Sequence, residues 1–73
     1  MVEPNTAIRV QINGETRDFT SSLSLLELLA QIEMNPRLIA IEYNGEILHR
    51  QYWSTTTINT GDCLEIVTIV GGG

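Results

Sequence analysis

The sequence ends in three consecutive glycines, Gly71, Gly72 and Gly73, and this ending is its best candidate for chemistry. A chain end without Cβ atoms is thin, so its terminal carboxylate can enter a narrow channel that side chains could not enter. A carboxylate is a poor electrophile because its negative charge repels nucleophiles, and it must first be converted to a mixed anhydride such as an acyl-adenylate. The ending therefore predicts a carrier whose Gly73 carboxylate is activated by a partner enzyme. The alternative is an inert, flexible tail.

Two further residues, Cys63 and His49, could take part in chemistry by their type. A reactive cysteine needs an electropositive setting, whereas Asp62 and Glu65 flank Cys63. His49 has no partner in the sequence that would make it a base or a ligand. We therefore expect Cys63 to be a small strand residue without a chemical role and His49 to be an ordinary surface histidine. No metal site can be assembled, and no nucleophile has a base beside it, so the chain is not expected to be an enzyme.

Length and composition limit the remaining possibilities. Seventy-three residues suffice for a single domain, expected over residues 1–73 with a flexible tail at 70–73. Nine acidic and four basic side chains give a net charge of −5, which disfavours nucleic acid as a partner. One cysteine excludes an internal disulfide, and the sequence shows no signal peptide and no long apolar run. We expect a cytoplasmic protein that contacts no membrane, binds no cofactor and is monomeric on its own.

Two Asn-Gly pairs, Asn13-Gly14 and Asn44-Gly45, predict the tight type I′ turns of two hairpins. The first turn follows residues 8–12, whose apolar and polar side chains alternate as in a half-buried strand, and leads into a strand ending at Phe19. The second turn joins residues 38–43, which are rich in strand formers, to a short strand at 47–48. The elements that carry the tail therefore include two antiparallel strand pairs.

A helix is predicted between the hairpins. Ser24 and Glu27 have the S-x-x-E spacing of a capping box, which satisfies free backbone N–H groups at a helix start. Leucines at helical spacing follow, and these are expected to cover one face of the sheet. Because Pro36 disfavours helical backbone at the residue before it, we expect a helix of about eleven residues that stops there.

The last strand is predicted from the nearly continuous apolar run over residues 63–70, which fits a central strand covered by the helix on one face and partly hidden on the other. If the first strand lies parallel to it, the fold is α+β of the β-grasp, or ubiquitin-like, type. This fold is a mixed sheet of about five strands with one main helix packed across one face. Val67, Ile69 and Val70 then form a partner-docking patch beside the tail, with simple sheet packing as the alternative.

Five parts of the sequence are specific by their order and spacing, although no single one of them is. They are SLLELL (24–29), IEYNGEILHR (41–50), Trp53, GDCLEIV (61–67) and IVGGG (69–73). In these parts the sequence resembles the ThiS-type sulfur carriers of thiamin (thiazole) biosynthesis, from Ile8 to Gly73. His49 departs from the proline expected before the arginine, at a position away from the reactive end.

The resemblance implies a sulfur-transfer cycle. An E1-like adenylyltransferase would use ATP to adenylate the carboxylate of Gly73, at the end of the Gly71-Gly72 tail. A persulfide sulfur supplied through a cysteine desulfurase would then displace AMP and leave a thiocarboxylate on Gly73, from which thiazole synthase takes the sulfur. On this interpretation the domain is a protein cosubstrate. The alternatives are a molybdopterin-type sulfur carrier and a ubiquitin-like binding or modifier domain.

Overall fold

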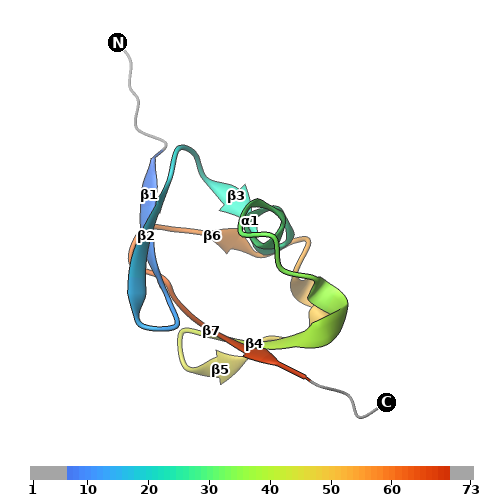
Figure 1. Cartoon of the computed structure of the whole chain (residues 1–73). Coiled ribbons are helices and arrows are strands. Elements are labelled where there is room, and N and C mark those ends of the chain that lie inside the picture. The colour runs from blue at the N-terminus through green and yellow to red at the C-terminus, as the bar shows by residue number, and fades with distance from the viewer. Residues whose placement is uncertain (1–6, 70–73) are drawn as a thin grey trace.

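The computed structural model describes residues 7–69 of the chain (Figure 1). Five strands form one mixed sheet in the order β2-β1-β7-β4-β5, α1 packs on one side of it, and β3 pairs with β6 in a second, two-stranded sheet. Because β1 and β7 run parallel, the predicted β-grasp architecture is confirmed. The elements are β1 (Ile8–Ile12), β2 (Glu15–Phe19), β3 (Leu23–Ser24), α1 (Leu25–Gln31), η1 (Pro36–Leu38), β4 (Ile39–Tyr43), β5 (Glu46–Ile47), η2 (Arg50–Tyr52), β6 (Thr57–Ile58) and β7 (Cys63–Thr68).

Both predicted hairpin turns are confirmed. Asn13 and Gly14 have φ values of 53° and 83°, and Asn44 and Gly45 have 53° and 89°, as two-residue turns of type I′ require. The first turn sets a register in which Arg17 lies opposite Val10, on the core side of the sheet. Arg17 is nevertheless exposed, because β2 is the edge strand and its side chain can extend past the core.

Helix α1 begins as predicted. The Ser24 hydroxyl accepts a hydrogen bond from the Glu27 N–H (3.1 Å), and the Glu27 carboxylate accepts one from the Ser24 N–H (2.8 Å), which completes the capping box. The helix buries Leu25, Leu28 and Leu29 completely. These leucines form the layer that covers the inner face of the sheet.

The helix ends earlier than predicted, since it has seven residues rather than about eleven. Glu33 takes a φ of 62°, its N–H donates to the Ala30 carbonyl (3.1 Å), and the Met34 N–H donates to the Leu29 carbonyl (2.9 Å). This arrangement is a Schellman cap, which satisfies the last carbonyls of the helix. The cap stops α1 before Pro36 can, and Pro36 instead begins η1.

Strand β7 lies between β1 and β4 and buries only one of its faces. Leu64 and Ile66 point into the core, whereas Glu65 and Val67 are exposed on the opposite side. The expectation that this second face is partly hidden was wrong, because α1 covers only the inner face of the sheet (Figure 1). The core is built from Ile8, Val10, Ile12, Phe19, Leu23, Leu25, Leu28, Leu29, Ile39, Ile41, Trp53, Ile58, Leu64 and Ile66.

Candidate functional site

Four of the predicted site residues, Val70, Gly71, Gly72 and Gly73, lie outside the described residues. The site is therefore built from the elements that lead to them. Strand β7 ends at Thr68, and the N–H of the next residue, Ile69, donates to the carbonyl of Leu38 at 2.6 Å. This bond anchors the last described residue against the start of β4.

An exposed apolar surface lies at this point on the outer side of the sheet, and we call it the tail face. Ala40 of β4 is the register partner of Val67 of β7. Leu38, the last residue of η1, is bonded to Ile69, the residue after β7, so these two pairs are adjacent. Ile47 of β5 lies opposite Glu42 on the same side. Val67 and Ile69 are 59% and 48% exposed, and Leu38 and Ile47 are 51% and 68% exposed. The tail face consists of Leu38, Ala40, Ile47, Val67 and Ile69.

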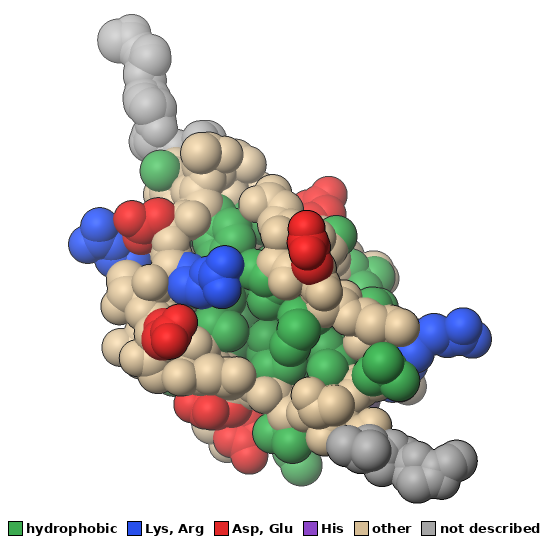
Figure 2. Space-filling model, in the orientation of Figure 1, with side chains coloured by type: hydrophobic (Ala, Val, Ile, Leu, Met, Phe, Trp, Pro, Cys, Tyr) green, Lys and Arg blue, Asp and Glu red, His purple; other side chains and the backbone are tan. Residues whose placement is uncertain are grey.

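The sequence analysis placed Val67 and Ile69 on this surface but missed Leu38, Ala40 and Ile47. Ile47 had a signal, because a two-residue turn at Asn44-Gly45 places it opposite Glu42. Leu38 had none, since its side of the sheet depends on how β4 pairs with β7. Along the lower edge of the molecule in Figure 2, acidic and hydrophobic side chains lie next to one another.

A shallow hollow continues the tail face toward η2. It measures about 180 Å³, and its lining includes Ile47, Ile69 and Trp53. Trp53 is 2% exposed and its indole N–H donates to the Leu48 carbonyl at 2.8 Å, which holds the segment after β5 against the core. The guanidinium of Arg50 lies 5.5 Å from the centre of the Trp53 ring. His49 also lines the hollow and is exposed, as expected for a surface histidine.

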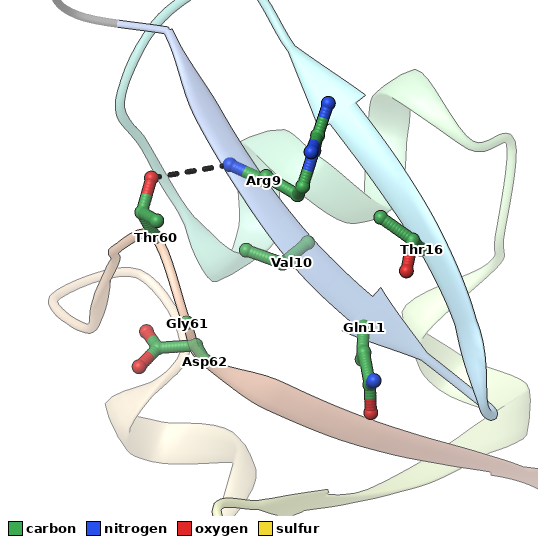
Figure 3. Close-up of a pocket in the computed structure, with 7 residues that line it drawn as sticks. All are labelled: Arg9, Val10, Gln11, Thr16, Thr60, Gly61 and Asp62. Carbon is green, nitrogen blue, oxygen red and sulfur yellow. Dashed lines mark hydrogen bonds between the residues drawn. The ribbon is translucent and has the colours of Figure 1, made fainter.

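A larger hollow of about 390 Å³ lies at the other end of β7, between the β1–β2 hairpin and the turn before β7 (Figure 3). Its charged lining residues, Arg9 and Asp62, are already engaged. The Arg9 side chain forms an ion pair with Asp18 (Nε–Oδ1 2.8 Å), which lowers the pKa of Asp18, and the Arg9 N–H donates to the Thr60 hydroxyl at 3.1 Å. This hollow therefore presents no unpaired charged group for a reaction.

Asp62, at the edge of that hollow, connects three segments. Its carboxylate accepts hydrogen bonds from the Tyr43 hydroxyl (2.7 Å), the Asn44 side-chain amide (3.2 Å) and the Asn59 N–H (2.8 Å). Burial and this carboxylate raise the pKa of Tyr43 to about 12, because both disfavour a tyrosinate there. The cluster fixes the β4–β5 turn against the turn before β7, which is a structural role.

Cys63 lies at the start of β7, half-buried, with its thiol 3.8 Å from the side-chain oxygen of Gln11. Six residues of extended chain, about 20 Å, separate Cys63 from Ile69, so the thiol is not beside the point where the tail begins. Within residues 7–69 no group of three or more His, Cys, Asp or Glu side chains is arranged to hold a metal ion. None of the helices described is both long and apolar enough to cross a membrane.

The parallel pairing of β1 with β7, with one helix across the mixed sheet, defines a domain of the ubiquitin-like β-grasp class. The chain is similar in structure to the thiamine biosynthesis protein ThiS of Geobacter metallireducens, with a TM-score of 0.79 and 30% identity over 90% of this chain and 100% of that one. The model of the ThiS family matches residues 10–73. The chain belongs to the ThiS family.

Similar sequences occur both as short proteins and within longer ones. A protein of Porphyra purpurea called ycf40 is 45% identical over 69 residues, which are 94% of this chain and 97% of that protein. A thiazole synthase of Paramagnetospirillum magneticum is 38% identical over 66 residues. This match covers 90% of the present chain but only 20% of the synthase, so the chain spans about one fifth of that relative.

Proposed function

We propose that this chain is a sulfur carrier for the thiazole ring of thiamin, formed by one domain over residues 1–73 whose tail, residues 70–73, carries sulfur on Gly73. The observation that carries the proposal is that the family match continues to residue 73, so it includes the terminal glycines. The anchoring of Ile69 beside the exposed tail face supports it, because a partner that docks there receives the tail directly.

The proposed chemistry takes place on partner enzymes. An E1-like adenylyltransferase joins a carboxylate oxygen of Gly73 to the α-phosphorus of ATP and releases pyrophosphate. A persulfide formed by a cysteine desulfurase attacks the acyl carbon, AMP leaves, and a thiol reductant cleaves the S–S bond of the acyl disulfide, so that Gly73 keeps a thiocarboxylate. Thiazole synthase takes the sulfur and returns the free carboxylate. The chain is a cosubstrate, and the ATP belongs to its partner.

The proposed docking surface is the tail face, which contains Val67 and Ile69 of the predicted patch, whereas Val70, the third residue of that patch, lies outside the described residues. Exposed apolar patches of this kind commonly mark partner sites. Thiazole synthase is supported as a partner by the Paramagnetospirillum magneticum protein of that name, one segment of which is similar to 90% of this chain. One polypeptide that joins the two parts keeps them at high effective concentration.

The test of the carrier function is incubation with ATP, a cognate activating enzyme and a sulfur source, followed by mass spectrometry of the intact chain. The full chain should gain the mass of one oxygen replaced by sulfur, at Gly73, whereas a chain lacking Gly73 should not. Sulfur gained by the shortened chain would contradict the terminal-carboxylate mechanism. In the native host, a large added mass would indicate a modifier, and transfer to a molybdopterin precursor would indicate the other carrier pathway.

The test of the docking surface is Val67→Asp, which places a charge in the centre of the tail face. Leu26→Asp is the matched control. Leu26, like Val67, is an exposed aliphatic side chain (38% exposed), but it lies on α1, away from the outer side of the sheet. We expect Val67→Asp to fold normally and to be adenylated more slowly, and Leu26→Asp to be adenylated at the normal rate. Unimpaired adenylation of a folded Val67→Asp chain would remove the docking role.

A further inference from the structure

Two carboxylates face each other directly on the outer side of the sheet. Glu42 of β4 and Glu65 of β7 are register partners, and both are exposed. In the described part of the chain the one ion pair is that of Arg9 with Asp18, so neither glutamate has a cationic partner there. Like charges directly opposite each other on a sheet are destabilising. The free chain therefore carries an unfavourable pair that its fold does not require.

The pair borders the tail face on two sides. Val67 follows Glu65 by two residues on the same side of β7, and Ile47 is the register partner of Glu42 across β4 and β5. Along the lower edge of the molecule in Figure 2, acidic side chains lie next to hydrophobic ones. A partner that covers the apolar residues of the tail face must also bring some of its own side chains against the two carboxylates.

We propose that the tail face and the pair Glu42–Glu65 together form the surface that binds thiazole synthase, and that the synthase places an Arg or Lys side chain against the two carboxylates. This inference rests on the proposed function and names the partner chemistry. Charge complementarity requires a cation there, since an uncharged or acidic partner surface would bury two like charges without compensation. The planar guanidinium of Arg, with five N–H donors, suits two adjacent carboxylates best.

The arrangement predicts that stability and binding respond in opposite directions to the same substitution. In the free chain, removing the repulsion should stabilise the sheet. In the complex, the covered apolar surface excludes water and strengthens the attraction between the carboxylates and the partner cation, so removing the charges should weaken binding. If the two glutamates served only folding, their substitution would not change stability and binding in opposite directions. If they served only solubility, the effect would not depend on these two positions.

The experiment compares the full-length chain with its Glu42→Gln/Glu65→Gln variant. The matched control is Glu15→Gln/Glu33→Gln, which makes the same change in net charge at exposed residues of β2 and of the cap that follows α1. We expect the first variant to raise Tm by about 2–4 °C. Its Kd for the thiazole synthase of the same organism, measured by titration calorimetry at low salt, should rise about tenfold. The control should leave Kd within about twofold of the unchanged chain.

Each outcome decides a separate point. If both variants weaken binding to the synthase equally, net charge alone determines the effect on Kd, and the inference is wrong. Unchanged binding by Glu42→Gln/Glu65→Gln would also overturn the inference. Failure of the unchanged chain to bind the synthase would overturn both this inference and the proposed recipient of the sulfur. Weakened binding of the variant together with a chain that never gains sulfur at Gly73 would uphold the docking surface and refute the carrier chemistry.

Discussion

The side chain of Asn13 should contribute strongly to stability, because it extends the pairing of β1 with β7 beyond the end of β1. Its oxygen accepts a hydrogen bond from the Ile66 N–H (2.7 Å), and its amide donates to the Ile66 carbonyl (3.2 Å). Asn13 also has a φ of 53°, in the left-handed region. Asn13→Ala removes two bonds worth about 1 kcal/mol each and replaces asparagine by a residue that tolerates the left-handed region less well, which costs about 1 kcal/mol more.

We therefore expect Asn13→Ala to lower the free energy of unfolding by about 3 kcal/mol, a large part of the roughly 4–11 kcal/mol that a domain of this length has. Asn13→Gly separates the two contributions, since glycine loses the same bonds but tolerates the φ, and it should cost about 2 kcal/mol. Urea unfolding followed by the fluorescence of Trp53, the single tryptophan, measures both.

A loss below about 0.5 kcal/mol for Asn13→Ala, with an unchanged m-value, would refute the assignment of these two bonds as stabilising. Equal losses for the alanine and glycine variants would show that the positive φ adds no cost. Because Ile66 precedes Val67 in the same strand, the variants also report how firmly the start of the tail face is held.

Three further predictions concern the elements around the site. Ser24→Ala should lower the free energy of unfolding by about 1 kcal/mol in urea titrations, because it removes the helix cap. Trp53→Phe should cost about 1–3 kcal/mol in urea titrations followed by circular dichroism, since the half-buried Leu48 carbonyl loses its donor. The pKa of Tyr43, raised to about 12, lies above its ordinary value of about 10, so the neutral phenol stabilises the fold fully below pH 10. That contribution should be lost as the pH rises from about 10 to 12, Tyr43→Phe should abolish this loss, and Asp62→Asn should lower the pKa seen in an absorbance titration.

Each of these predictions has an outcome that contradicts it. A Ser24→Ala chain as stable as the unchanged one would mean that the cap contributes nothing in solution. Full stability of Trp53→Phe would show that water or another group satisfies the Leu48 carbonyl. An unaltered tyrosine titration in Asp62→Asn would mean that the carboxylate has no part in raising the pKa of Tyr43.

Local signals in the sequence predicted the local structure well where a short segment holds all the atoms involved. The Asn-Gly turns and the Ser24–Glu27 capping box are of this kind, because each satisfies its hydrogen bonds within four residues. The end of α1 was predicted less well, since Glu33 adopts the left-handed conformation that usually calls for glycine. The β3–β6 pair was missed because strands of two residues have no period to detect.

By itself the sequence determined that the fold is a β-grasp sheet with one helix, and that the glycine tail is the candidate for chemistry. Only the tertiary structure decided which side chains surround the start of that tail. The antiparallel pairing of β4 with β7 makes Glu42 the register partner of Glu65 and brings the Leu38 carbonyl within hydrogen-bond distance of the Ile69 N–H. The physical reason is that a strand's register is set by partners more than twenty residues away, and a shift of one residue would move every side chain to the other face.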